Sequence, residues 1–287
     1  MFRNHRNDFP TLSGENAPVY LDNACMTLRP TSVIEAIRSY YEESPGCGGR
    51  SVHRYATAVS RKMVNCRNNL GKLFNANESN EIIFTKNATH SLNQVAKGLK
   101  WEKNDVILTT DREHNSNLIP WLQLEEEQGV DHRVVKSNDD NTFNIENFEN
   151  ACAEAGRNLK MVSLSHVGNL DGIATPVKEV AKIAKDHGAL VCIDGAQSTP
   201  HMKVDVQDLG IDFMAFSLHK MGTSSMVCSL HTECLISDCV RVWISLAHSS
   251  STSCGSHSCE AYLPSWYDMG FSSRLDWYAH LSYLVLR

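Results

Sequence analysis

The chain has 287 residues, of which 42% are hydrophobic and 21% are charged, and its formal net charge is −6. It is long enough to bury a substantial core in one large domain or two smaller ones. The acidic balance argues against a nucleic-acid partner, which would favour a basic surface. No apolar run approaches the roughly 20 residues that span a membrane, and the polar start, MFRNHRNDFP, lacks the apolar centre of a secretory signal. We therefore expect a cytoplasmic protein with no membrane partner.

The ten cysteines are unevenly distributed. Half are scattered over the first 222 residues, and the others are concentrated in the tail: Cys228, Cys234, Cys239, Cys254 and Cys259. Without an export signal, reduced thiols are the default. No pair has the Cys-x-x-Cys spacing typical of zinc sites. We predict no metal, although His231, His248 and His257 could add ligands to the tail cysteines.

The predicted elements begin with two helical patterns, at residues 31–43 and 58–74. From about residue 80 to 220, short apolar runs alternate with amphipathic stretches. The candidate strands are 81–84, 105–110, 132–136, 159–165, 189–194 and 213–217. Residues 89–100 and 176–188 lie between strands and read as helices, and the second has a proline in its first turn and a glycine at its end. The alternation predicts an α/β domain with a mainly parallel sheet and helices on both faces.

The character of the chain changes after Lys220. Residues 223–287 contain no lysine and many serines. The run 245–261 has no useful hydrophobic period and is expected to form a loop, whereas 275–287 could form a short amphipathic helix. We divide the chain into an N-terminal segment (1–17), a large domain (18–222) and a divergent tail (223–287).

Polar residues follow several of the predicted strands, and ligands of parallel α/β sheets bind beyond the carboxyl ends of the strands. These residues are Thr89, His114, Asn169, Asp194, Gln197, Ser217, His219 and Lys220. Pyridoxal 5'-phosphate (PLP) chemistry requires such a set. It needs an amine for the cofactor aldehyde and a carboxylate facing the pyridine nitrogen. It also needs a flat group against the ring, and hydroxyls or a helix N-terminus around the phosphate.

The run DGAQSTPHMKVDVQDLGIDFMAFSLHKMG (194–222) resembles the cofactor-lysine region of class V aminotransferases and cysteine desulfurases of the sulfur-mobilisation type, with their selenocysteine-lyase relatives. Further stretches agree in the family's order: 20–30, 48–56, 84–96, 112–121 and 165–177. Several motifs in order are more specific than any one alone. The resemblance implies the large domain of a PLP-dependent transferase of the aspartate-aminotransferase-like type, fold type I, with the small C-terminal domain largely missing.

The resemblance also implies roles for individual residues around the PLP ring. Lys220 would be the Schiff-base lysine, and Asp194 would face the pyridine nitrogen. Gln197 would hydrogen-bond the ring hydroxyl. His114 would stack on the ring and assist proton transfer. Asn169 would lie near the substrate carboxylate and a cofactor oxygen.

The phosphate and substrate contacts are implied in the same way. The phosphate would be bound by the backbone of Ala88 together with Thr89, Ser217 and His219. Residues on loops that approach the substrate in the family are Asn23, Ala24, His53 and Arg54.

Each role has an ordinary alternative. An isolated lysine after a strand is usually a solvated surface residue, and an aspartate there often caps a helix. Likewise, His114 could lie on the surface, Thr89 could be a simple helix cap, and Asn169 could serve a turn. The spacing of Asp194 and Gln197 upstream of Lys220 favours the cofactor roles.

The resemblance ends near Gly222. In the family, the smaller C-terminal domain supplies an arginine for the substrate carboxylate and the mobile cysteine that takes sulfur as a persulfide. No segment of 223–287 matches either one, and we nominate no replacement cysteine.

The function implied is removal of sulfur from L-cysteine to give alanine and a persulfide. The partners implied are the amino-acid substrate, a second copy of the chain in a homodimer, and a sulfur-acceptor protein. Two alternatives stay open. One is another class V PLP enzyme, such as an aminotransferase, epimerase or lyase. The other is a catalytically impaired remnant that keeps the PLP fold.

Overall fold

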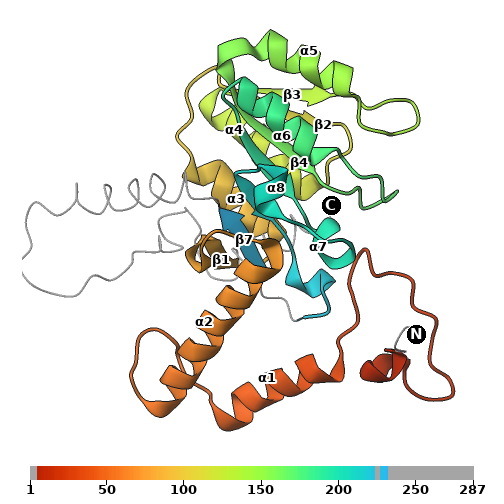
Figure 1. Cartoon of the computed structure of the whole chain (residues 1–287), viewed down its shortest axis with the longest axis vertical. Coiled ribbons are helices and arrows are strands. Elements are labelled where there is room, and N and C mark those ends of the chain that lie inside the picture. Colours follow the sequence, from red (N-terminus) through yellow and green to blue (C-terminus); the bar gives the residue numbers. More distant parts are fainter. Residues whose placement is uncertain (1–4, 224–226, 232–287) are drawn as a thin grey trace, which may run out of the picture. The chain divides into compact units, whose positions relative to one another are not determined.

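A seven-stranded sheet organises the chain in a computed structural model that describes residues 5–223 and 227–231 (Figure 1). The strand order is β1-β7-β6-β5-β4-β2-β3. The strands are β1 (Ile82–Thr85), β2 (Val106–Thr110), β3 (Asp131–Val135), β4 (Leu159–Ser165), β5 (Leu190–Asp194), β6 (Phe213–Ala215) and β7 (Val227–His231). Strands β6, β5, β4, β2 and β3 pair in parallel, whereas β7 is antiparallel to both β1 and β6. The predicted mainly parallel α/β fold is confirmed.

Eight α-helices connect or precede these strands within the described residues. They are α1 (Thr31–Glu43), α2 (Arg54–Phe74), α3 (Ala88–Gly98), α4 (Ile119–Gln128), α5 (Ile145–Ala155), α6 (Val177–Asp186), α7 (Ser198–His201) and α8 (Val206–Leu209). Side-chain caps fix several starts, because they satisfy backbone N–H groups that the helix itself leaves free. The Asn87 side chain accepts from His90 N at 2.8 Å before α3, and Asn144 accepts from Asn147 N at 2.8 Å before α5.

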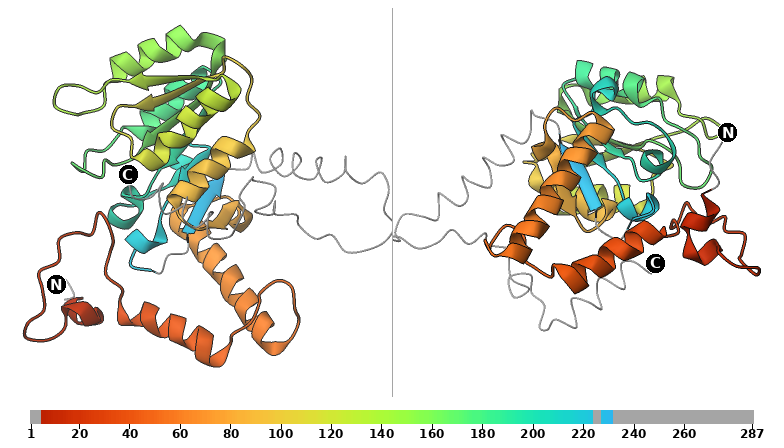
Figure 2. Two further views of the ribbon diagram at one scale, coloured as in Figure 1. Left: turned by 180° about the vertical axis from the view of Figure 1, so that it is seen from behind. Right: turned by 60° about the horizontal axis from the view of Figure 1, so that its bottom comes forward.

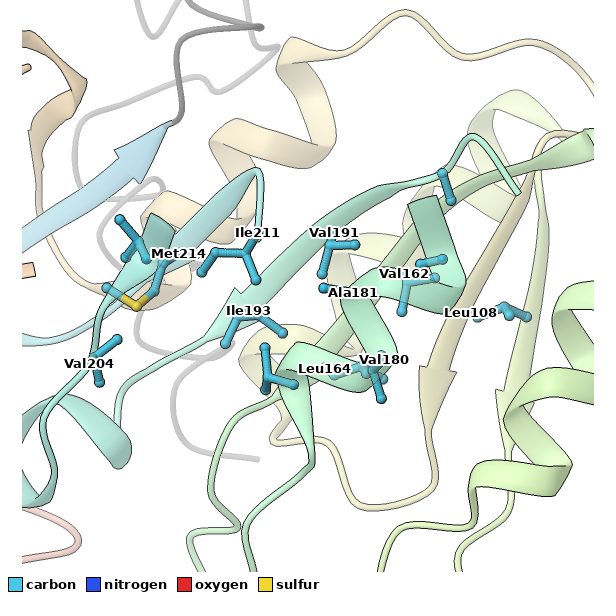
Figure 3. Packing of buried hydrophobic residues seen from close by; sticks show 14 of the residues in the cluster. Leu108, Val162, Leu164, Val180, Ala181, Val191, Ile193, Val204, Ile211 and Met214 are labelled. Carbon is cyan, nitrogen blue, oxygen red and sulfur yellow. The ribbon is translucent and has the colours of Figure 1, made fainter. Parts of the chain in front are cut away.

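The sheet buries apolar side chains on both faces, since neighbouring strand residues point to opposite sides. Val191 and Ile193 of β5 pack with α6 on one face, and Cys192 packs with α3 and α4 on the other. Figure 3 shows Ile193 and Val191 close to Val180 and Ala181 of α6. Two-sided burial fixes the strand register. The carboxyl ends of β6, β5, β4, β2 and β3 share one edge because these strands run parallel.

Helix α1 and the beginning of α2 extend away from the sheet (Figures 1 and 2). No residue of α1 is buried, and most of the buried residues of α2 lie near its end, where Leu70 and Phe74 join the core. Ile34, Ile37 and Tyr41 of α1 are exposed. The described part of the chain therefore leaves an apolar stripe on α1 uncovered.

The structure differs from the predictions at the edges of several elements and in elements that were not predicted. Helix α2 begins four residues before the predicted start, and β6 ends at Ala215 rather than residue 217. Strand β7 was not predicted, although it inserts between β1 and β6. The predicted loop at 245–261 and the helix at 275–287 lie outside the described residues. Among the described helices, none is both long enough and apolar enough to cross a membrane.

Candidate active site

The candidate site lies where β5 and β6 end and α3 begins. Asp194 is the last residue of β5, and Ser217 follows β6 directly before the short 3₁₀ turn Leu218–Lys220. Ala88 is the first residue of α3. The fold therefore brings residues from three separated segments to one edge of the sheet, as the sequence predicted.

A buried carboxyl group and a partly buried amine interact at this edge. Asp194 is 6% exposed, and its Oδ1 atom accepts a hydrogen bond from Ala196 N at 2.9 Å. Burial raises the pKa of Asp194, and the Ala196 bond and the charges of Lys220 and His114 oppose that shift. Burial lowers the pKa of Lys220, opposed by the charges of Asp194 and Cys25. An amine with a lowered pKa is more often neutral and can act as a nucleophile.

The start of α3 forms an anion-binding arrangement. The buried Ser217 hydroxyl accepts a hydrogen bond from Ala88 N at 3.2 Å. The Thr89 hydroxyl lies 2.7 Å from the Ser116 hydroxyl. Backbone N–H groups and the helix dipole at this end favour negative charge. These donors fit a phosphate group.

His114 is held by the short turn that follows it. It caps the 3₁₀ turn Asn115–Asn117, and its Nδ1 atom accepts from Ser116 N at 3.1 Å. The Ser116 hydroxyl lies 3.0 Å from the same nitrogen. The hydroxyls of Ser116 and Thr89 therefore link the imidazole to the start of α3, and Nε2 is left for other contacts.

The segment before α1 folds over the 3₁₀ turn that contains Lys220. Gln197 Nε2 donates to the Ala24 carbonyl at 2.8 Å. The Thr27 hydroxyl donates to the His219 carbonyl at 2.8 Å and accepts from Gly222 N at 2.7 Å. Burial lowers the pKa of the His219 imidazole, and the positive charges of Lys220 and Arg29 add to the effect. These contacts bring Ala24 to the predicted cofactor residues.

Other predicted site residues are not joined to this cluster. Asn169 lies in a loop closed by a hydrogen bond from Gly172 N to Gly168 O at 3.1 Å, and its side chain has no hydrogen bond to a described residue. His53 caps α2, and Arg54 lies over the Tyr55 ring. The first turn of α2 is the end of that helix remote from the sheet (Figure 1). Asn23 stays exposed without a side-chain hydrogen bond to the described residues.

The family described as aminotransferase class-V matches residues 19–225. The chain belongs to this family.

Two relatives of this chain are both named probable cysteine desulfurases. A probable cysteine desulfurase of Halalkalibacterium halodurans is 40% identical over 220 residues, which are 75% of this chain and 53% of the relative. A second, from Methanothermobacter thermautotrophicus, is 39% identical over 233 residues, which are 79% of this chain and 56% of the relative. The chain therefore spans a little over half the length of these relatives.

Solved structures of class V proteins share the fold. The apo structure of a cysteine desulfurase from Thermococcus onnurineus NA1 is 34% identical with a TM-score of 0.75, covering 81% of this chain and 57% of that one. The Escherichia coli cysteine desulfurase CsdA is 29% identical with a TM-score of 0.70, covering 79% and 57%. The predicted family and fold type are confirmed.

Several residues of the candidate site were not predicted from the sequence. Ser116 and Glu113 lie inside the REHNSN stretch, so their position in a recognised motif was an available signal. Thr27 and Cys25 lie in the YLDNACMTLRP stretch, where Thr27 contacts His219 and Cys25 acts electrostatically on Lys220. No local pattern distinguishes these residues from their neighbours.

Proposed function

We propose that this chain carries PLP on Lys220 and removes sulfur from L-cysteine. The observation that supports it most directly is the electrostatic coupling of the buried Asp194 carboxyl group to the Lys220 amine, whose pKa is lowered. PLP requires an amine that holds its aldehyde carbon and a carboxyl group that faces its pyridine nitrogen, and these two residues would supply them. The names of the class V relatives support the choice of cysteine as the substrate.

Each residue of the proposed site has a distinct task. Lys220 holds the cofactor and, once released from it, carries a proton to or from the α-carbon of the substrate. Asp194 keeps a positive charge on the pyridine nitrogen. When bound, PLP withdraws electrons from the substrate carbon atoms. Gln197 donates to the ring hydroxyl, and His114 covers one ring face.

The phosphate is held by the start of α3 in this proposal. The backbone of Ala88 and the hydroxyls of Ser217 and Thr89 lie at this end of the helix, and His219 is the fourth contact. Asn169, Asn23, His53 and Arg54 are proposed to meet the substrate, His53 and Arg54 from a second copy of the chain. The last assignment explains why the beginning of α2 is remote from its own sheet.

The reaction transfers one sulfur atom to a thiol. The bond between Cβ and Sγ of L-cysteine breaks, a bond forms between this sulfur and an acceptor thiolate, and Cβ gains a proton. The products are alanine and a persulfide, so atoms and electrons balance without an external oxidant. We propose a homodimer in the cytoplasm and a sulfur-acceptor protein that receives the persulfide sulfur.

Covalent trapping tests the cofactor assignment. We expect borohydride treatment of the PLP-loaded full chain to attach the cofactor permanently to Lys220, as found by peptide mass spectrometry. Lys220→Ala should abolish the label. Lys203→Ala, which changes an exposed lysine in the same segment, should keep it. A label elsewhere, or none in the unaltered chain, would refute the role of Lys220.

Product analysis tests the substrate. L-cysteine and a thiol reductant should give alanine and sulfide in equal amounts, and Lys220→Ala should give neither. A change in the cofactor absorbance with another amino acid, without sulfide release, would favour a different class V reaction. Retention of PLP with no response to any amino acid would favour an impaired remnant.

A further inference from the structure

Glu113 directly precedes His114; the residue is partly exposed, but its carboxyl group is enclosed and accepts three side-chain hydrogen bonds. The Thr110 hydroxyl donates to Oε1 at 2.6 Å. Asn117 Nδ2 and the Ser165 hydroxyl both donate to Oε2 at 2.7 Å. The donors come from the end of β2, the end of β4 and the turn after His114. One carboxyl group therefore joins three parts of the chain.

Asn117 anchors the other end of the same turn to β4. It is fully buried, and its Oδ1 atom accepts from the Ser163 hydroxyl at 2.6 Å and from Trp121 Nε1 at 3.2 Å. Residues 113 and 117 are thus both tied to β4, one on each side of His114. The side chains of Glu113 and Asn117 therefore hold the backbone on both sides of His114.

The imidazole of His114 itself is exposed. Among the described residues, its Nδ1 atom is hydrogen-bonded only to Ser116, which belongs to the same turn. No core residue packs the ring into one orientation in the described part of the chain. Its direction consequently depends on how firmly the turn is held.

A buried carboxyl group is a costly way to hold a turn. Burial raises the pKa of Glu113, and the bonds from Thr110, Asn117 and Ser165 offset this shift only in part. No ion pair neutralises Glu113 among the described residues. Apolar packing would stabilise the turn at lower cost, because removing a carboxyl group from water is unfavourable. The carboxyl group does, however, fix direction, since each of its hydrogen bonds has a defined geometry.

We propose that Glu113 is a positioning residue that holds His114 over the cofactor ring. This inference rests on the proposed function, because the ring in question is that of PLP on Lys220. Glu113 itself touches neither ring nor substrate in this scheme. It acts by clamping the Glu113–Asn117 turn to β2 and β4.

Two substitutions separate geometry from charge. Glu113→Gln keeps an oxygen for the Asn117 and Ser165 donors, and its amide can donate to the Thr110 hydroxyl. Glu113→Ala leaves all three donors without a partner. We expect the visible circular dichroism of bound PLP, which reports ring environment, to be retained in Glu113→Gln and to fall by half or more in Glu113→Ala. The dissociation constant for PLP should rise about tenfold in Glu113→Ala only, as for a loss of about 1.4 kcal/mol.

A double-mutant cycle distinguishes positioning from general loss of stability. In a His114→Ala background, Glu113→Ala should change neither the dichroism nor the affinity further, because the residue through which it acts is gone. Val180→Ala, on the buried side of α6, is the control for destabilisation and should leave the cofactor signals unchanged. If Glu113→Ala does not fold, Ser165→Ala removes one donor and should give a smaller loss of the same kind.

The possible failures can be told apart. If the unaltered chain takes no PLP on Lys220, the proposed function is wrong. If it does, but Glu113→Ala behaves like the unaltered chain, the positioning role is wrong. Equal effects of Glu113→Ala with and without His114 would also overturn that role and would leave Glu113 as a structural residue.

Discussion

Asp194 and Lys220 have opposite pKa shifts with a common cause. Burial disfavours the charged form of each, so it raises the pKa of the carboxyl group and lowers that of the amine. The charge of each group partly opposes the pKa shift of the other. In the protein without cofactor, burial therefore opposes ionisation of the Asp194 carboxyl group.

Asp194→Asn should therefore stabilise the cofactor-free protein at neutral pH while weakening PLP binding. The folded-state pKa of Asp194 is raised, so its contribution to stability is present below its unfolded-state pKa and is lost as pH rises through the folded-state value. Asparagine removes this loss and can still accept from Ala196 N. The free energy of unfolding, measured in urea from acidic to neutral pH, should show an advantage for the variant that disappears as pH falls.

Asp212→Asn is the matched control. Asp212 is also nearly buried, but its Oδ2 atom accepts from Val191 N at 2.8 Å and its Oδ1 atom lies 3.4 Å from Lys185 Nζ. Its replacement loses an ion pair and should destabilise the protein by about 1 kcal/mol at neutral pH. If both variants, or neither, stabilised the protein, the destabilising effect assigned to the buried Asp194 carboxyl group would be contradicted.

At the scale of elements, the start of α3 is hydrogen-bonded to the segment after β6. The Ser217 hydroxyl and Ala88 N are bonded across 129 positions of sequence. Helix α3 has 11 residues, so its N-terminus carries an appreciable dipole field. The position of Ser217 at the end of a parallel strand is what brings the hydroxyl to this helix.

Ser217→Ala should weaken binding of PLP about tenfold, the effect of roughly 1.4 kcal/mol. Binding of pyridoxal, which lacks the phosphate, should be unchanged, because the hydroxyl is assigned to the phosphate alone. Absorbance titrations with the two compounds give the comparison. Ser91→Ala removes a buried hydroxyl from the same helix beyond its first turn and should affect neither. Equal losses for both compounds would place Ser217 elsewhere in the mechanism.

Elements whose signals are local could be predicted from the sequence. Strand β4 and helix α1 have the predicted bounds, because an apolar run and a helical period are visible in the residues themselves. Strand β7 could not be predicted, since its place between β1 and β6 depends on pairing with distant residues. Helix α4 was missed because its apolar residues gather in its first half and its acidic residues in its second.

The same distinction applies to the site. Asp194, Ser217 and Lys220 could be predicted because parallel strands bring their carboxyl ends to one edge. The bond from Thr27 to the His219 carbonyl joins residues 192 positions apart, and no local pattern reports it. The hydrogen bonds of Glu113 could not be predicted for a similar reason, because the donor Ser165 lies on β4, far from Glu113 in the sequence.

At the scale of the whole molecule, buried apolar residues cover both faces of the described sheet, yet helix α1 has no buried residue. Ile193 is fully buried between β5 and α6, whereas Ile34 on α1 is 43% exposed. The chain also spans little more than half the length of its relatives. The contribution of α1 to stability therefore tests whether the described core accounts for folding by itself.

Ile193→Ala should lower the free energy of unfolding by about 2 to 5 kcal/mol, because it removes buried methyl groups and leaves a cavity. Ile34→Ala makes the same chemical change on a surface that the described residues leave open, so we expect a change within about 0.5 kcal/mol. Urea unfolding at several protein concentrations measures both. A large effect of Ile34→Ala that grows with concentration would mean that a second copy covers α1, because only association makes stability depend on concentration. A large effect that is independent of concentration would mean that another part of the same chain packs on α1. The core of the sheet and its helices would then not account for the whole stability of the chain.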